Sequence, residues 1–141
     1  MAIRRSGART SAVKNAFRVW QFVRIMVRLE ETVKTRGRSP RDRLYREWRA
    51  SWDEVDRALT RLGESDADAF ADLMMDHDVV LPCSEDQKGQ LGQVIDEVVA
   101  ELSKAIAARE GSTEQLRHLR FERTELVKLR KRIVPASKSR K

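Results

Sequence analysis

The stretch SPRDRLYREWRASWDEVDRALTRLG, residues 39–63, decides the fold of this chain. Its apolar residues recur every three or four positions, the spacing that places side chains on one face of an α-helix. These residues are Leu44, Trp48, Trp52, Val55, Leu59 and Leu62. Ser39 can cap the helix, Pro40 suits its first turn, and Gly63 is typical of a helix end. We therefore predict a helix over residues 40–62.

The same signals predict four further helices. Ser84 and Ser112 each begin an S-x-x-Q capping box, and Asp66 and Asp68 place acidic side chains where a helix dipole favours them. The predicted ranges are about 10–35, 65–76, 85–110 and 113–133. The first of these helices is apolar on two faces, which is typical of a helix at the centre of a bundle or one covered by a partner subunit.

The predicted fold is all-α, a single-domain bundle of about five helices. Residues 10–135 form the bundle, and residues 1–9 form a flexible basic N-terminus. Residues 136–141 are basic without an apolar anchor, so we expect a disordered tail. The apolar run Val79–Cys83 is expected to be an extended connector that closes one end of the bundle.

Charge is distributed unevenly along the 141 residues, whose net charge is +7. Residues 1–50 hold 14 Lys and Arg against 4 Asp and Glu. Residues 51–111 hold 5 against 15, and residues 112–141 hold 10 against 3. Such basic ends favour a polyanionic partner. The alternative is that basic and acidic helices neutralise one another, within one molecule or between subunits.

Signals for catalysis are weak. Cys83 has no base that can be placed beside it, and no Gly-rich phosphate loop is present. His77 lies between Asp76 and Asp78, but adjacent residues of a helix point in different directions, so we predict no metal site. His118 lacks the arginine spacing of helical ribonucleases. We expect no enzyme activity, no cofactor and no small-molecule substrate.

Membrane association is not expected either. No apolar run approaches the ~20 residues that cross a bilayer. The apolar arc of residues 10–35 is too wide for a helix lying in a membrane interface. Residues 1–29 lack acidic side chains, as transit peptides do, but the pattern continues into Glu30 without a break. The single cysteine fits a reducing compartment, and we expect a cytoplasmic location.

Arginine clusters predict the contact surface for nucleic acid, because a guanidinium can bind phosphate through two hydrogen bonds. One face is predicted from Arg24, Arg28, Arg36, Arg38, Arg41 and Arg43. A second is predicted from Arg120, Arg123, Arg130 and Lys131. Tyr45 could stack on an unpaired base or belong to the core, whereas Trp48 lies on the apolar stripe and is expected in the core. A helix-turn-helix over residues 58–74 is rejected, because its acidic second helix would be repelled by phosphates.

The expected function is that of a non-catalytic helical subunit of a larger nucleoprotein complex. It would contact the phosphates of RNA or DNA with little sequence specificity. The alternative is a protein–protein assembly or adaptor module, a homo-oligomer or a hetero-oligomer. In that case the acidic middle of one copy would meet the basic end of another.

Overall fold

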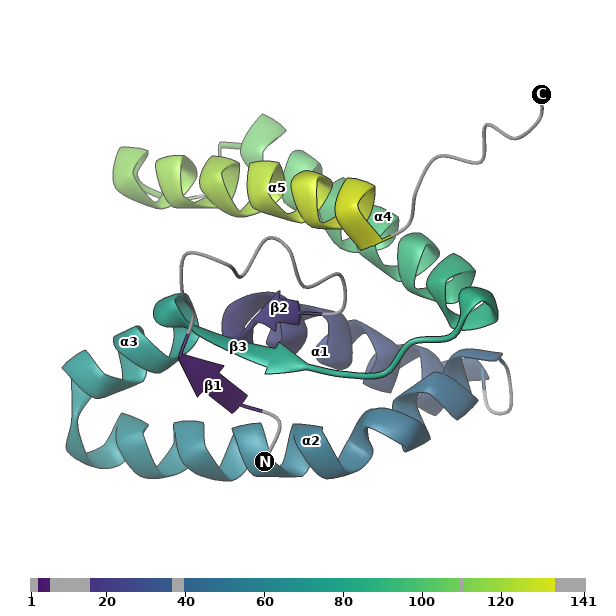
Figure 1. Ribbon diagram of the computed structural model, residues 1–141. Coiled ribbons are helices and arrows are strands. Elements are labelled where there is room, and N and C mark those ends of the chain that lie inside the picture. Colours follow the sequence, from purple (N-terminus) through teal and green to yellow (C-terminus); the bar gives the residue numbers. More distant parts are fainter. Residues whose placement is uncertain (1–2, 6–15, 37–39, 110, 134–141) are drawn as a thin grey trace. The chain divides into compact units, whose positions relative to one another are not determined.

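The computed structural model describes residues 3–5, 16–36, 40–109 and 111–133 (Figure 1). The described residues contain five helices, so the predicted helical fold is confirmed. They also contain three short strands, which the sequence pattern does not predict. By its internal contacts the chain divides into two compact units, Met1–Cys83 and Ser84–Lys141. The predicted tail, residues 136–141, lies outside the described residues.

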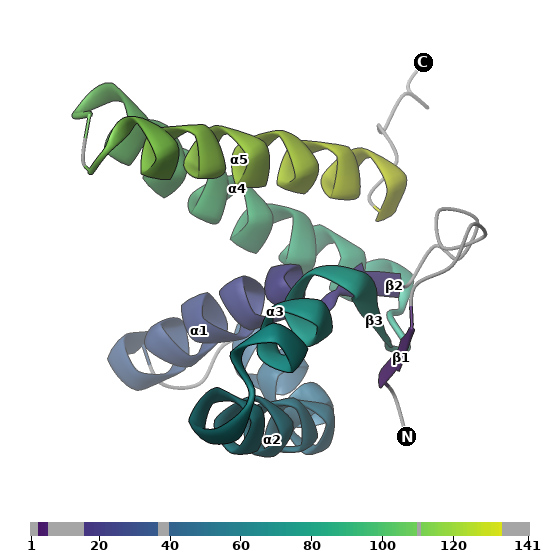
Figure 2. The same ribbon diagram turned by 90° about the vertical axis from the view of Figure 1, so that its left-hand side faces the viewer.

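The first unit is built on three helices, α1 (Val19–Arg36), α2 (Pro40–Ser65) and α3 (Ala67–Asp76). Figure 2 shows α3 turning back over α2 and beside α1. Trp48 of α2 is fully buried, as predicted, and its ring meets Phe17 edge-on with 5.5 Å between the centroids. Its indole Nε1 donates a hydrogen bond to the carbonyl oxygen of Pro82 at 3.1 Å. Trp48 therefore joins α2 to two segments distant in sequence.

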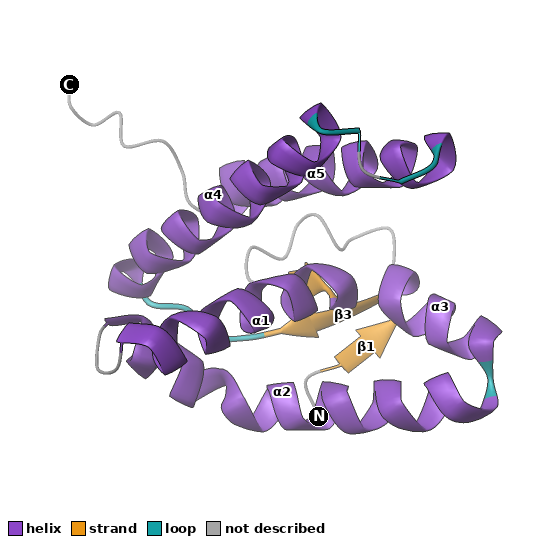
Figure 3. Cartoon of the chain, turned by 180° about the vertical axis from the view of Figure 1, so that it is seen from behind, coloured by secondary structure: helices purple, strands orange, loops and turns teal. Residues whose placement is uncertain are grey.

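A small sheet completes the first unit (Figure 3). Its strands are β1 (Ile3–Arg5), β2 (Ala16–Arg18) and β3 (His77–Val80). Strand β3 is central and runs antiparallel to both neighbours, so Val79 faces Ile3 on one side and Phe17 on the other. The fully buried Asp78 faces Arg18, and their charged atoms Oδ1 and Nη1 are 3.7 Å apart.

This sheet corrects two predictions. The helix predicted from residue 10 begins only at Val19, after the strand Ala16–Arg18, and residues 10–15 lie outside the described residues. The strand Ile3–Arg5 falls within the segment predicted to be flexible, residues 1–9. The physical reason is that the β-branched Val79 and Val80 favour a strand, whose backbone groups then pair with both segments.

The boundaries of the other four helices match the predicted ones to within three residues. Helix α2 continues through Gly63 to Ser65 instead of ending at the glycine. Helix α3 then starts at Ala67, with the side chain of Asp66 accepting a hydrogen bond from the Ala69 N–H at 3.0 Å. An aspartate at this position satisfies one of the backbone donors that a helix start leaves unpaired.

The second unit is a helical hairpin of α4 (Glu85–Ala107) and α5 (Thr113–Ile133) (Figure 1). Both predicted capping boxes are present. Ser84 Oγ accepts from the Gln87 N–H at 3.2 Å, and the Gln87 side chain accepts from the Ser84 N–H at 2.9 Å. Gly111, at φ 94°, reverses the chain between the helices, a conformation that glycine adopts without steric cost.

Candidate nucleic-acid interface

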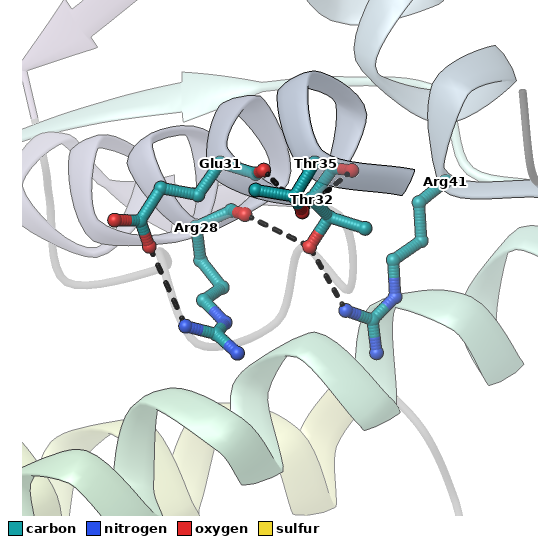
Figure 4. A network of polar contacts seen from close by, with 5 residues as sticks. All are labelled: Arg28, Glu31, Thr32, Thr35 and Arg41. Carbon is teal, nitrogen blue, oxygen red and sulfur yellow. Dashed lines mark hydrogen bonds and ion pairs between the residues drawn. The ribbon is translucent and has the colours of Figure 1, made fainter. Parts of the chain in front are cut away.

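Two members of the first predicted contact face, Arg28 and Arg41, interact with other residues of the first unit (Figure 4). Arg41 is only 6% exposed, and its Nη1 donates to Thr32 Oγ1 at 3.3 Å. That hydroxyl in turn donates to the carbonyl oxygen of Arg28 at 3.2 Å. The Arg28 guanidinium lies 3.4 Å from the Glu31 carboxylate. Arg41 was predicted to bind phosphate, but in the structure its side chain is buried and hydrogen-bonded to Thr32, so it is not exposed to a ligand.

The remaining members of that face differ in their exposure to solvent. Arg43 is exposed and Arg24 is half-buried. Arg38 and the side chain of Arg36 lie outside what the structure describes. The exposed Arg46, two turns into α2, is paired with Asp42 at 3.0 Å. Carboxylates on α1 and α2 thus offset much of the positive charge that the sequence places there.

Tyr45 is not available to stack on a base. It is 7% exposed, and its hydroxyl donates to Glu30 Oε2 at 3.3 Å. The Arg49 guanidinium carbon lies 5.7 Å from the centroid of its ring. Burial, reinforced by the Glu30 carboxylate, raises the pKa of Tyr45 above its ordinary value of 10.0. Of its two predicted roles, the structure supports a place in the core.

The second predicted face is also divided, between α5 residues that point into the hairpin and residues that point outward. Arg130 Nε lies 2.7 Å from Asp96 Oδ1 and 3.4 Å from the carbonyl oxygen of Gly92. Arg123 Nη1 donates to Ser103 Oγ at 3.3 Å. Arg120 and Lys131 are exposed. Two of the four predicted residues therefore link α5 to α4, and two face solvent.

The outward side of α5 forms what we call the α5 basic face. Its members are exposed and recur at helical spacing: Arg117, Arg120, Lys128 and Lys131. They lie opposite the buried stripe of Leu126, Leu129 and Ile133. Among the described residues Arg117, Arg120 and Lys131 make no ion pair, and Lys128 Nζ lies 3.4 Å from Oε2 of the half-buried Glu125. At 1.5 Å per residue, the face is about 21 Å long.

An aromatic pair on α5 is a feature that the sequence prediction lacks. The rings of His118 and Phe121 are stacked, with 6.3 Å between centroids and 29° between planes. Phe121 is 42% exposed, and the His118 side chain is 57% exposed. Glu122, which is buried, lies with Oε2 3.1 Å from His118 Nε2. One signal could have revealed Phe121: it is the aromatic residue of α5 that falls off the apolar stripe.

A cleft of about 630 Å³ opens at the loop end of the hairpin. Residues of both helices and of their connection line it: Ala105, Gly111, Glu114, Gln115, His118 and Leu119. Its wall is mostly apolar, with one carboxylate, one amide and one imidazole. Since His118 belongs both to the cleft and to the aromatic pair, the two features adjoin each other on the surface of the second unit.

Metal-ligating side chains do not converge in the described part of the chain, where no group of three His, Cys, Asp or Glu could hold an ion. His77 Nδ1 instead lies 3.2 Å from the carbonyl oxygen of Asp72. No helix among residues 16–36, 40–109 and 111–133 is long and apolar enough to cross a membrane. Comparison of the chain with protein-family models, curated proteins and solved structures finds no match.

Proposed function

We propose that this protein is a non-catalytic nucleic-acid-binding protein that contacts phosphates through the α5 basic face. One observation carries the proposal. Four cations line one exposed side of a single helix, and three of them make no ion pair among the described residues. Exposed cations without local partners are those that can release counterions from a phosphate backbone.

The geometry also explains why little sequence specificity is expected. The α5 basic face is a row of exposed cationic side chains without the Asn or Gln amides that read adenine. Phosphate contacts position a protein on nucleic acid but carry no sequence information. Binding would therefore depend on charge and salt more than on base order.

The test is the salt dependence of binding to a fluorescent mixed-sequence oligonucleotide between about 50 and 300 mM salt. Four contacts predict a slope of log K against log salt near −2.8 for a single strand and near −3.6 for a duplex. Replacing Arg120 and Lys131 by Gln should make the single-strand slope shallower by about 1.4. Basic residues outside the described part can add to the total slope, so the difference between variants is the decisive quantity.

A matched control removes the same charge elsewhere. Arg57 and Arg61 are exposed on α2 and stand one turn apart, so replacing both by Gln leaves the net charge equal to that of the α5 variant. We expect this control to keep the wild-type slope. Equal slopes for both variants, or no binding by the wild type at 50 mM salt, would refute the proposal.

A second candidate function has its own observation. Exposed carboxylates lie at the end of α2, at the N-cap of α3 and on α3: Glu64, Asp66, Asp68 and Asp76. They could receive the α5 basic face of another copy, which would make the protein a self-assembling module. Light scattering distinguishes this candidate, because the mass would exceed 16.3 kDa at low salt and fall to it when Asp66 and Asp68 are replaced by Lys.

A further inference from the structure

Phe121 lies on the side of α5 that carries the α5 basic face, and His118, on which its ring stacks, lies in the wall of the neighbouring cleft. Phe121 follows Arg117 by one helical turn and precedes Lys128 by about two, so its ring stands between cations on the same side of the helix. At 42% exposure the phenyl ring offers part of its surface to solvent. Covering that surface with another apolar or aromatic group would stabilise a complex.

The rings are held in place by the interactions of α5 itself. The buried Glu122 carboxylate lies 3.1 Å from His118 Nε2, which fixes the imidazole along the helix. The imidazole then stacks against Phe121 at an interplanar angle of 29°. A side chain supported in this way loses less conformational freedom when a ligand binds to it.

Nucleic acid offers phosphates and bases for binding, and this side of α5 carries cations for the first and an aromatic ring for the second. Phosphates suit Arg117 and Lys128, which flank Phe121 on the helix. A duplex keeps the faces of its bases inside the stack, whereas a single strand exposes them to aromatic side chains. We infer that the α5 basic face binds single-stranded nucleic acid, with an unpaired base stacked on Phe121 beside His118. This inference rests on the proposed function and assigns its substrate class.

The experiment compares Phe121→Leu with the wild type on three ligands of equal length: a single strand, a duplex, and a single strand made of abasic units. Leucine keeps an apolar side chain and the helix but removes the aromatic face. We expect single-strand affinity to fall by about 5- to 150-fold, the range for losing one stacked base. Affinity for the duplex and the abasic strand should change less than twofold.

Four controls make the result specific to the aromatic ring of Phe121. Val127 is another exposed apolar residue of α5, at 37%, so Val127→Ala should leave single-strand affinity within twofold of wild type. The salt slope of Phe121→Leu should equal that of the wild type, because no charge is removed. Phe121→Trp should retain single-strand binding, and circular dichroism should show the same helix content for every variant.

The outcomes separate this inference from the proposed function. Wild-type protein that binds no ligand overturns both. Binding with the expected salt slope but an equal effect of Phe121→Leu on single strand and abasic strand, or no effect on either, overturns base stacking and leaves the phosphate interface standing. Selective loss on the base-containing single strand supports the inference.

Discussion

Replacement of Trp48 tests the account of the first unit most directly. Its side chain is fully buried, meets Phe17 at 5.5 Å and Phe22 at 6.1 Å between centroids, and donates to the Pro82 carbonyl. Trp48→Phe keeps an aromatic ring but removes the hydrogen bond to the carbonyl oxygen of Pro82, an exposed residue, which should cost about 0.5–1.5 kcal/mol. Trp48→Ala also opens a cavity and should cost about 3–5 kcal/mol.

The assay is urea unfolding of the full chain, followed by circular dichroism at 222 nm. A typical domain is stable by about 5–15 kcal/mol, so the alanine variant should unfold at a much lower urea concentration than the phenylalanine variant. Trp52→Phe is the matched control, because Trp52 is half-buried and contacts Phe22 at 6.0 Å. If Trp48→Phe costs no more than Trp52→Phe, the hydrogen bond to Pro82 does not stabilise the unit as argued.

Further predictions concern glycine positions, a helix cap and alkaline pH. Gly89 is exposed in α4 with open space around it, so Gly89→Ala should stabilise the protein by about 0.5–1 kcal/mol. Gly111→Ala should destabilise it by about 1–3 kcal/mol, because φ is +94° and the new methyl group would clash with Gln115. Ser84→Ala should cost about 1 kcal/mol by removing a capping box. The pKa of the Tyr45 hydroxyl is raised in the folded state, so the free energy of unfolding falls as pH rises above 10. Tyr45→Phe lacks this hydroxyl, so between about pH 10 and 12 its free energy of unfolding should fall less than that of the wild type.

Thermal or urea unfolding measures each of these variants. The two glycine variants control for each other, since both replace glycine by alanine in the same unit and the expected signs are opposite. If both variants changed the free energy of unfolding in the same direction, the stated role of backbone conformation at residue 111 would be contradicted. Parallel pH profiles of the wild type and Tyr45→Phe would contradict the effect of burial on the pKa of that hydroxyl.

The helices were predictable because each one is specified by signals close together in sequence. A capping serine and a glutamine three residues later define the start of α4, and both hydrogen bonds of that box are formed. The apolar stripe of α2 predicts that Trp48 is buried, and it is. Local signals of this kind need no knowledge of the rest of the chain.

The strands could not be predicted in the same way. Three residues, such as Ala16–Arg18, are too few to show the alternating pattern of a strand, and both Ala16 and Phe17 are buried. Their pairing depends on β3, which lies some sixty residues later in the sequence. Strand formation at this position is a property of the partner as much as of the segment itself.

The contact surface shows a similar limit. Arg41 and Arg43 are neighbours of the same type, yet one is buried and the other exposed. Net charge by segment indicates where cations lie in the sequence but not which of them hydrogen-bond internally. On α5, the 3.6-residue period could have separated Arg120 and Lys131 from Arg123 and Arg130, since the latter pair borders the apolar stripe.

The register of the sheet has a consequence for synthesis on the ribosome. Ile3 pairs with Val79, so the first strand is made 76 residues before its partner exists. At about 5–20 residues per second, the nascent chain carries β1 without its partner strand for about 4–15 s. During that interval the backbone groups of β1 lack their native partner and can pair with water, with other parts of the same chain or with other chains. Codons that slow translation of the intervening residues prolong this exposure, and a faster passage to Val79 shortens it.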